Sequence, residues 1–340
     1  MIPAVPAADA YEAARHRAAF IDRSDRARIV VSGADRASFL QGLLTNDVVA
    51  LKAGDGCYTA YLTAQGRMIA DLYVYELGDV MLLTLERDVK DAVLTRLDQV
   101  IFSEDVQLGD VTDTFAQVAI VGPDAASMLA PLLAGLPGTS ADALSALGEH
   151  GNLRATWNGE PAIVTRIADG GEPGYDVFVD RGKADAFTAA VAGAGAAPLD
   201  EQTAEAIRIE AGVPRFHRDM DEETIPLEAG IEGRAINMNK GCYVGQEVII
   251  RVLHRGHGRV ARKLVGLTID GDAVPARAAV VKSGDKDGDK EIGAITSAVR
   301  SDALNHPIAL AYLQRDFIEP GTTVFVGGAH ASVTPLPFVS

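Results

Sequence analysis

The stretch from Asn239 to Glu247, NKGCYVGQE, is the most informative part of the chain. It places Cys242, one of only two cysteines, between Gly241 and Gly245 and two residues after Lys240. Glycine permits backbone turns that other residues resist, so the stretch predicts a tight polar turn that presents a thiol. The alternative is a partly buried structural cysteine that packs as a small apolar side chain. If the thiol is functional, Lys240 is placed to lower its pKa.

The bulk composition limits the classes of protein that the chain can belong to. A length of 340 residues predicts two or three domains, and 48% hydrophobic with 23% charged residues is typical of a globular protein. A formal charge of −16 disfavours nonspecific binding to nucleic acid or anionic membranes, because both are polyanions. Two distant cysteines and the absence of an apolar run of about 20 residues predict a cytoplasmic protein without a transmembrane helix.

The first third of the chain alternates helical and strand-like patterns. Three short strand-like runs between Cys57 and Leu85 are separated by AQGR and LGD, which predicts antiparallel hairpins. Around them we predict helices at 9–20, from Asp35 to 44 and at 87–99, and strands at 26–33, 106–110 and 114–121. This mixture indicates an α+β fold rather than a βαβ nucleotide-binding fold.

The remainder predicts more mixed structure and then a separate domain. Residues 122–151 predict a helix flanked by loops, and they are followed by strands at 161–167 and 174–180 and helices at 182–193 and 201–211. After Lys263, short strands with turns such as SGDKDGDK and VGGAH are typical of a small β-barrel. We therefore divide the chain into residues 1–262 and a C-terminal barrel, 263–340.

Two acidic residues are candidates for binding or catalysis. Asp71 lies inside the apolar run MIADLYVYE, where a carboxylate at the edge of a cleft would have a raised pKa; an ordinary acid on the polar face of a strand is the alternative. Glu172, in GGEPGYDVFVD, could accept two hydrogen bonds from an amidine-like ring edge, or it could be a solvated turn residue.

A basic segment, RVLHRGHGRVARK at 251–263, contains no acid. It suits a phosphate or carboxylate tail, and a solvated surface strand or loop is the alternative. His254 and His257 lack accompanying acid or cysteine ligands, so we predict no metal site there. The basic residues of the segment are Arg251, Arg255, Arg259, Arg262 and Lys263.

Taken together, these segments resemble a known family. The string KGCYVGQE, 240–247, is similar to the K-G-C-[FY]-x-G-Q-E signature of YgfZ-type folate-binding proteins, which are relatives of the glycine cleavage T-protein, an aminomethyltransferase. The segments VSGADRASFLQGLLTNDV (31–48), AQGRMIADLYVYE (64–76) and GGEPGYDVFV (170–179) extend the resemblance over most of the chain. It implies a three-domain cloverleaf of mixed helix and antiparallel-sheet domains around a central opening that admits tetrahydrofolate, with a C-terminal β-barrel.

The resemblance also implies site residues. It places Glu172 at the pterin edge, Asp71 on the folate-site strand and Arg208 near the folate tail. Tyr175, Gln246 and Glu247 complete the expected folate contacts, and Cys242, Lys240 and Asp71 are the expected reactive groups.

The function implied is a tetrahydrofolate-binding accessory protein for iron–sulfur enzymes, with a link to tRNA modification and with iron–sulfur client or assembly proteins as partners. The alternatives are a tetrahydrofolate-dependent aminomethyl- or methyltransferase and a nucleic-acid-binding module. Two departures from the transferase pattern favour the accessory protein: Ala70-Asp71 replaces two consecutive acids, and a cysteine-bearing turn replaces the transferase turn.

Overall fold

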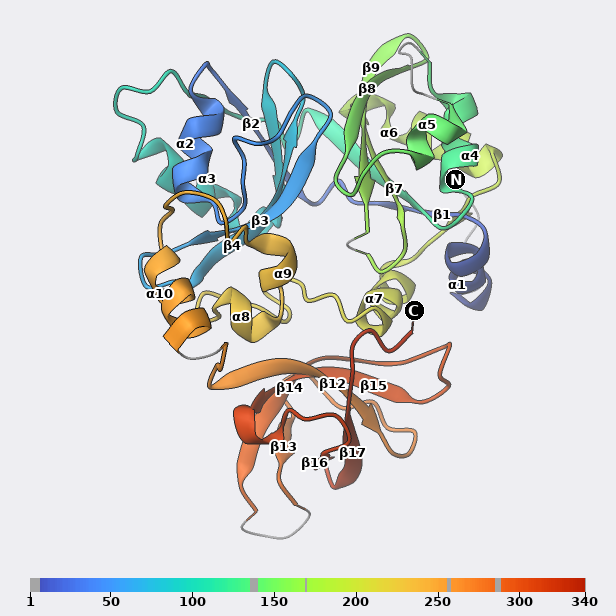
Figure 1. Cartoon of the computed structure of the whole chain (residues 1–340). Coiled ribbons are helices and arrows are strands. Elements are labelled where there is room, and N and C mark those ends of the chain that lie inside the picture. The colour runs from blue at the N-terminus through green and yellow to red at the C-terminus, as the bar shows by residue number, and fades with distance from the viewer. Residues whose placement is uncertain (1–6, 135–139, 169, 256–257, 285–288, 340) are drawn as a thin grey trace.

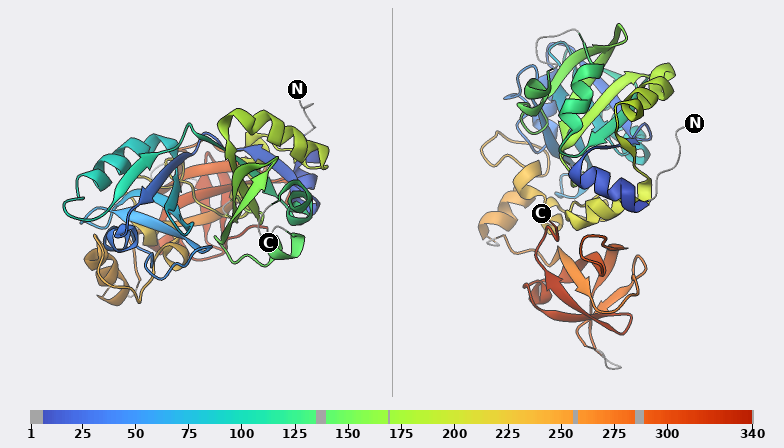
Figure 2. Two further views of the ribbon diagram at one scale, coloured as in Figure 1. Left: turned by 90° about the horizontal axis from the view of Figure 1, so that it is seen from above. Right: turned by 90° about the vertical axis from the view of Figure 1, so that its right-hand side faces the viewer.

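The computed structural model describes residues 7–134, 140–168, 170–255, 258–284 and 289–339. Two sheet-containing lobes lie side by side above a β-barrel (Figure 1), and in the view from above the barrel strands are seen between the two sheets (Figure 2). The predicted α+β cloverleaf with a C-terminal barrel is confirmed.

The first lobe is a five-stranded sheet covered by helices. The strand order is β3-β4-β5-β2-β6, and neighbouring strands are antiparallel. The three strand-like runs between Cys57 and Leu85 form β3, β4 and β5, as predicted, and the predicted helix at 87–99 is a 3₁₀ turn followed by α3. Its elements are β2 (Ala27–Ser32), α2 (Arg36–Leu43), β3 (Gly56–Leu62), β4 (Met68–Glu76), β5 (Met81–Leu85), α3 (Lys90–Asp98) and β6 (Gln107–Asp110).

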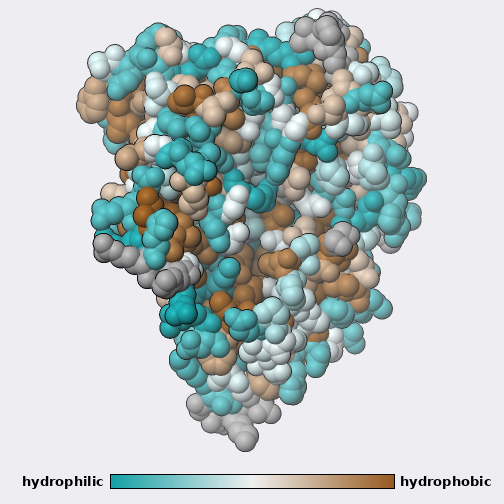
Figure 3. Space-filling model, in the orientation of Figure 1, coloured by the Kyte–Doolittle hydropathy of each residue, from teal (hydrophilic) through white to brown (hydrophobic). Residues whose placement is uncertain are grey.

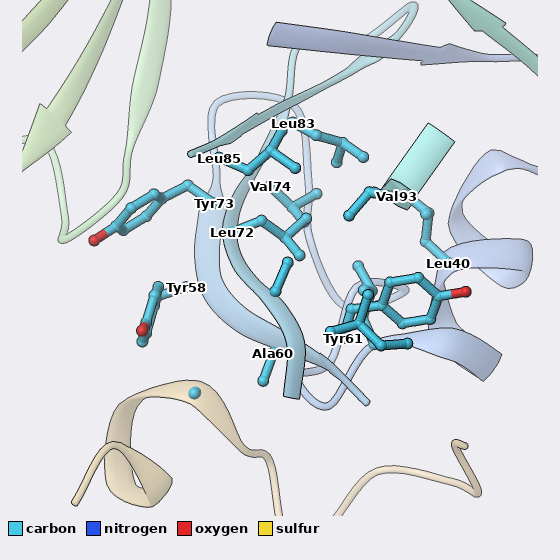
Figure 4. Packing of buried hydrophobic residues seen from close by; sticks show 14 of the residues in the cluster. Leu40, Tyr58, Ala60, Tyr61, Leu72, Tyr73, Val74, Leu83, Leu85 and Val93 are labelled. Atoms are coloured by element: carbon cyan, nitrogen blue, oxygen red, sulfur yellow. The ribbon is translucent and has the colours of Figure 1, made fainter. Parts of the chain in front are cut away.

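The two faces of this first sheet have different roles, because side chains alternate along a strand. Figure 4 shows Leu40 and Val93 from the helices packed with Val74, while the rings of Tyr58 and Tyr73 project from the opposite side of the sheet. Tyr58 and Tyr73 are cross-strand partners, with ring centroids 5.1 Å apart. The helix-covered face is therefore core, and the tyrosine face is turned toward the middle of the molecule.

The second lobe is a six-stranded sheet in the order β11-β1-β7-β10-β9-β8. All its neighbouring strands are antiparallel except β1 and β11, which are parallel. Its strands are β1 (Ala19–Asp22), β7 (Phe115–Val121), β8 (Asn152–Trp157), β9 (Glu160–Ile167), β10 (Gly174–Asp180) and β11 (Ala197–Pro198). Its helices are α1 (Ala7–His16), α4 (Ala125–Leu129), α5 (Ala141–Ser145) and α6 (Ala184–Gly193).

The structure of this lobe differs from the prediction in three details. The helix expected at 9–20 ends at His16, because residues 19–22 pair with β7 and β11 as strand β1. Strand β8 was not predicted, and neither was the two-residue β11. Local pattern misses short strands of this kind, since their stability comes from sheet partners that are distant in sequence. Part of the predicted 122–151 segment, 135–139, lies outside the described residues.

The C-terminal lobe is a closed barrel in the order β12-β15-β14-β13-β16-β17. Closure leaves no free sheet edge, and the interior is filled by apolar side chains such as Leu267, Val281 and Leu313. The strands are β12 (Arg262–Ile269), β13 (Val280–Lys282), β14 (Glu291–Arg300), β15 (Pro307–Gln314), β16 (Thr323–Val326) and β17 (Ala329–Thr334).

Helix α7 (Glu201–Glu210) and three short helices connect the lobes. Asp200 caps α7 by accepting a hydrogen bond from the Thr203 amide at 2.8 Å. Ile209, near the end of α7, packs against Leu264 and Leu310 of the barrel. The short helices are α8 (Pro226–Ala229), α9 (Glu232–Ala235) and α10 (Gln246–Ile250).

The NKGCYVGQE stretch contains a turn, and α10 begins within it at Gln246. Gly245 has φ of +84°, and a Cβ at that position would lie 2.5 Å from the carbonyl oxygen of Thr63. Only glycine fits this close approach to the β3–β4 connection.

Candidate functional site

A cavity of about 370 Å³ lies where the two sheets and α7 meet. The tyrosine face of the first sheet contributes Tyr58, Asp71 and Tyr73, and the second lobe contributes residues from β1 and β7 together with Glu172. Residues of α7, the 213–218 loop and α9 complete the lining. Two of the acids predicted from sequence, Asp71 and Glu172, therefore meet in one cavity although they lie 101 positions apart in the sequence.

Asp71 is held by a tyrosine hydroxyl inside this cavity. The Tyr58 hydroxyl donates a hydrogen bond to Asp71 Oδ2 at 2.7 Å. Asp71 is the only partly exposed position of the otherwise buried strand β4. Burial raises the pKa of the Asp71 carboxyl, against the lowering effect of the Tyr58 bond. The carboxyl is thus oriented by the protein and is a weaker acid than an exposed aspartate.

Glu172 belongs to an ion-pair network that sequence reasoning did not find. Arg15 of α1 forms ion pairs with Glu172 and with Glu210, the last residue of α7. Glu210 is fully buried and also accepts hydrogen bonds from the hydroxyls of Tyr11 at 2.7 Å and Ser301 at 2.5 Å. Arg15 contacts Oε1 of Glu172, and within the described residues no hydrogen bond reaches the second oxygen, Oε2. That oxygen is available to a ligand in the cavity.

A second cluster of charges joins the first sheet to the 213–218 loop. Glu86 accepts a hydrogen bond from Arg26 at 2.8 Å and two from Arg215, at 3.0 and 3.2 Å. Burial acts to raise the pKa of Glu86, but the charge of Arg26 and the bond from Arg215 outweigh it and lower the pKa. The cavity wall therefore keeps an ionised, fully paired carboxylate at this point.

Arg208, predicted to lie near the folate tail, lines the cavity but is already engaged. A guanidinium has five N–H donors, and all five of Arg208 are used: by Glu205 twice, at 2.6 and 2.8 Å, by Asp219 at 2.8 Å, by Ser297 at 3.0 Å and by the carbonyl of Val213. A contact with a folate tail would have to replace one of these bonds.

Lys240 is not turned toward Cys242. Its side chain is buried, and Nζ donates hydrogen bonds to the carbonyl oxygens of Gln41 at 2.7 Å, Leu44 at 2.6 Å and Asn46 at 2.8 Å. The first two oxygens lie at the end of α2, where the last carbonyls of a helix lack partners within the helix, and Asn46 follows shortly after. Burial lowers the pKa of Lys240 to about 8. Lys240 thus ties the NKGCYVGQE turn to the first lobe.

The other three residues expected at the turn lie on its outside. Cys242 is exposed, and Glu247 is 85% exposed and pairs with Arg251 at 2.8 Å, one helical turn away. Gln246, half-buried, begins α10. None of the three is among the described residues that line the cavity. The turn buries Tyr243 and Lys240, and Cys242 is exposed at a position that does not line this cavity.

Tyr175 and the described residues of the basic segment are also not among the residues that line the cavity. The Tyr175 side chain packs in the core of the second lobe with residues such as Val164 and Val177. In the basic segment, Arg262 pairs with Glu228 at 3.1 Å, so acids absent from the local sequence are supplied by the fold. His257 and the side chain of Arg255 lie outside the described residues.

The residues that the structure describes have two further properties, which concern metals and membranes. They contain no group of three or more histidine, cysteine, aspartate or glutamate side chains arranged to hold a metal ion. They also contain no helix long and apolar enough to cross a membrane. On the face shown in Figure 3, hydrophilic residues are interspersed with small apolar groups.

Comparisons with known proteins extend over the full architecture described above. The GCVT N-terminal domain model matches residues 5–240, and the glycine cleavage T-protein C-terminal barrel domain model matches residues 262–340. The chain belongs to the glycine cleavage T-protein family. Members of this family use tetrahydrofolate.

Individual T-protein relatives agree with this assignment. An aminomethyltransferase of Rubrobacter xylanophilus is 32% identical over 96% of this chain and 85% of its own length. One of Streptomyces avermitilis is 32% identical over 97% of this chain and 88% of its own length. The crystal structure of glycine cleavage system aminomethyltransferase T from Bartonella henselae has the same fold, with a TM-score of 0.86, 24% identity and coverage of 99% of this chain and 91% of that one.

These findings correct the function expected from sequence. The accessory role in iron–sulfur assembly is contradicted, since the relatives that match this T-protein family chain over nearly its whole length are named aminomethyltransferases. The YgfZ-type assignment and the iron–sulfur partners find no support among them. The eight-residue signature covers only one turn and the first two residues of α10, whereas the family models match residues 5–240 and 262–340.

The structure also shows why the two departures from the transferase pattern carry little weight in this T-protein family member. Ala70 is fully buried and, by strand alternation, points to the opposite side of β4 from Asp71. An acid missing at position 70 therefore changes the core side of the strand and leaves the cavity unchanged. The cysteine-bearing turn likewise places Cys242 outside the cavity lining.

Several residues of the site gave no usable signal in the sequence. Arg15 lies 157 positions from Glu172, and Tyr58 lies on a different strand from Asp71. One signal was available. If β3 and β4 are paired as an antiparallel hairpin in the observed register, Tyr58 lies on the same face of the sheet as Asp71 and Tyr73. The partners of Arg15 depend on how α1 packs against α7, which no local pattern encodes.

Proposed function

We propose that this chain is a tetrahydrofolate-dependent aminomethyltransferase. The observation that carries the proposal is the match, over nearly the whole length of both proteins, to relatives named aminomethyltransferase. The cavity supports it, because it brings an oriented carboxyl, a carboxylate with an uncommitted oxygen and two aromatic rings into one space of about 370 Å³.

The lining suits the flat, donor-rich pterin ring of a folate. Tyr58 and Tyr73 offer aromatic faces, and Glu172 offers Oε2 as an acceptor for the ring's N–H donors. Arg15 holds the other Glu172 oxygen, so the carboxylate is already oriented before a ligand arrives. Little conformational freedom is then lost on binding at this end of the cavity.

Asp71 is the residue that we assign to the reaction. When bound, tetrahydrofolate would supply the nitrogen that accepts the carbon of an aminomethyl group carried on the sulfur of a lipoyl arm, with release of ammonia and of the arm in its free dithiol form. The Tyr58 hydroxyl fixes Asp71 Oδ2, and burial raises the pKa of the Asp71 carboxyl, which favours its protonated form relative to an exposed aspartate. In this proposal Asp71 orients the substrate amine and exchanges a proton with it.

The direct test is a transfer assay with the intact protein. Tetrahydrofolate and a lipoyl carrier protein loaded with an aminomethyl group are supplied, and methylenetetrahydrofolate and ammonia are measured. Asp71→Asn should lower kcat by about 10²–10⁴-fold, the usual contribution of a positioned acid–base group. Asp113→Asn, at an 85% exposed acid outside the cavity, is the matched control and should leave kcat unchanged. Wild-type protein that forms neither product would contradict the proposed function.

A further inference from the structure

Arg234 lines the cavity of about 370 Å³, and the proposed reaction gives it no role. It belongs to α9, and its guanidinium carbon lies over the ring of Tyr58, 5.3 Å from the ring centroid. The same ring projects from the first sheet (Figure 4), and its hydroxyl donates the 2.7 Å hydrogen bond to Asp71. A cation, an aromatic ring and the carboxyl assigned to the reaction are therefore linked in series.

Hydrogen bonds to the backbone hold Arg234 and Tyr58 relative to each other. Nδ2 of Asn46 donates to the carbonyl oxygen of Tyr58 at 2.9 Å and to that of Arg234 at 3.1 Å. Thr45 Oγ1 donates to the carbonyl oxygen of the next residue of α9, Ala235, at 2.6 Å. The backbone that carries the guanidinium is thus anchored beside the strand that carries the ring.

The guanidinium of Arg234 has few other partners. In the described part of the chain it donates no hydrogen bond, and its ion-pair partner is Glu149, which lies 3.7 Å away and is 59% exposed. An exposed pair of this kind contributes little to the position of a side chain. All five N–H donors of Arg208, in contrast, are engaged. The buried ring of Tyr58 is therefore the contact that most favours the observed position of Arg234.

The charge of Arg234 makes the Tyr58 hydroxyl a stronger hydrogen-bond donor. A cation is attracted to the face of an aromatic ring, and its field favours the loss of a proton from a phenol. Burial, followed by the charge of Asp71, raises the pKa of Tyr58, and the charge of Arg234 acts in the opposite direction. The hydroxyl therefore keeps its proton, and it donates more strongly to Asp71 when the cation is present.

The carboxyl of Asp71 responds to this donor and to one pair of opposite charges. Burial raises the pKa of Asp71, whereas the Tyr58 bond and the charge of Arg26 lower it, and the charge of Glu86 raises it. Arg26 and Glu86 are joined at 2.8 Å, so their effects on the carboxyl oppose each other. A hydrogen bond donated to a carboxylate favours its ionised form, so a stronger Tyr58 bond shifts Asp71 toward that form.

We propose that Arg234 is a positioning residue of this site, which acts through the Tyr58 ring on the hydrogen bond that orients Asp71. The inference rests on the proposed function, because Asp71 is the group assigned there to proton exchange. It requires a cation over the ring rather than arginine in particular, since lysine also forms cation–π contacts. It also requires the Tyr58 hydroxyl, because the hydroxyl carries the effect from the ring to the carboxyl.

A double-mutant cycle in the transfer assay, at saturating tetrahydrofolate, tests both requirements. Arg234→Met removes the charge and keeps an unbranched side chain over the ring, so kcat should fall about threefold, within the usual range for one cation–π contact. In the Tyr58→Phe background, which keeps the ring and lacks the hydroxyl, the same substitution should leave kcat unchanged. Arg234→Lys should retain most of the wild-type kcat.

A carbon-13 NMR titration of the aspartate carboxyls separates this inference from the proposed function, since it needs no turnover. The Asp71 signal is identified by its absence from Asp71→Asn. Arg234→Met should raise the midpoint of the Asp71 titration by about half a pH unit, because a weaker Tyr58 donor stabilises the carboxylate less. In Tyr58→Phe the midpoint should not respond to Arg234→Met. A wild type without transfer activity would refute the proposed function and leave this shift to decide the role of Arg234.

Arg315→Met is the matched control, because Arg315 also has an acid at 3.7 Å, Asp316, but does not line the cavity. It should change neither kcat nor the Asp71 midpoint. An unchanged midpoint in Arg234→Met would overturn the inference. Equal shifts with and without the Tyr58 hydroxyl would also overturn it, since Arg234 would then act on Asp71 or on the ligand directly. An Arg234→Lys variant as impaired as Arg234→Met would contradict the requirement for a cation over the ring.

Discussion

Arg15 should contribute more to the stability of the second lobe than any exposed charge of α1. Its guanidinium is shared between Glu172, which is 13% exposed, and Glu210, which is fully buried. Removing one partner of a buried ion pair costs about 3–5 kcal/mol, because the other charge is left buried and uncompensated. Water can solvate Glu172, and Glu210 keeps its bonds from Tyr11 and Ser301. We therefore expect Arg15→Met to cost about 3 kcal/mol, the lower end of this range.

The chain carries its own reporter for this measurement. Its single tryptophan, Trp157, is buried in the second lobe against Phe187, with ring centroids 5.3 Å apart. Guanidinium titration followed by Trp157 fluorescence therefore follows the lobe that contains α1. Arg17→Met, at an exposed arginine of the α1–β1 connection, is the matched control and should change the free energy of unfolding by less than about 0.5 kcal/mol.

A double-mutant cycle tests the stated cause. Glu210→Gln keeps an acceptor for the Tyr11 hydroxyl and removes the buried negative charge. The cost of Arg15→Met is expected to come from that uncompensated charge. If so, the double variant should lose about 2 kcal/mol less free energy of unfolding than the two single variants lose in total. Additive effects, within about 0.5 kcal/mol, would refute the reasoning.

Three further outcomes follow from the same structure. Because burial raises the Asp71 pKa, its contribution to stability is present at low pH and lost as pH rises through the folded pKa; Asp71→Asn should raise Tm at pH 7, with a gain that shrinks on acidification, and a lower Tm at pH 7 would contradict this. Because burial lowers the Lys240 pKa from 10.5 to about 8, the unfolded chain binds the extra proton between these values; the stability of the wild type relative to Lys240→Met should therefore grow from pH 8 to 10.5, and a flat difference would argue against a buried ammonium. Iodoacetamide should alkylate the exposed Cys242 of the folded protein well before Cys57, which is buried and has a pKa raised to about 12, and equal rates measured by mass spectrometry would oppose the assigned burial.

The sequence could indicate a site residue only where the features that mark it are local. It could not indicate the contacts that a side chain makes with distant residues. Asp71 and Glu172, which line one cavity, could be singled out because each stands out against its own neighbours, one as an acid in an apolar strand and the other as an acid on a glycine-rich turn. Lys240 was misread because proximity along the chain suggested a role beside Cys242, whereas Nζ reaches carbonyls almost 200 positions away. A long side chain can bond in any direction that packing leaves open.

The sequence by itself indicated most of the strands and helices, the strand-rich domain after the mixed domains and the acid on β4, since these depend on patterns within about ten neighbouring residues. Only the tertiary structure decided which groups share a cavity. The Arg15 bridge to Glu210 and the bond from Arg208 to Ser297 each join segments that the chain separates widely. Burial and charge pairing set their energies, and both are properties of the packed molecule that local sequence does not contain.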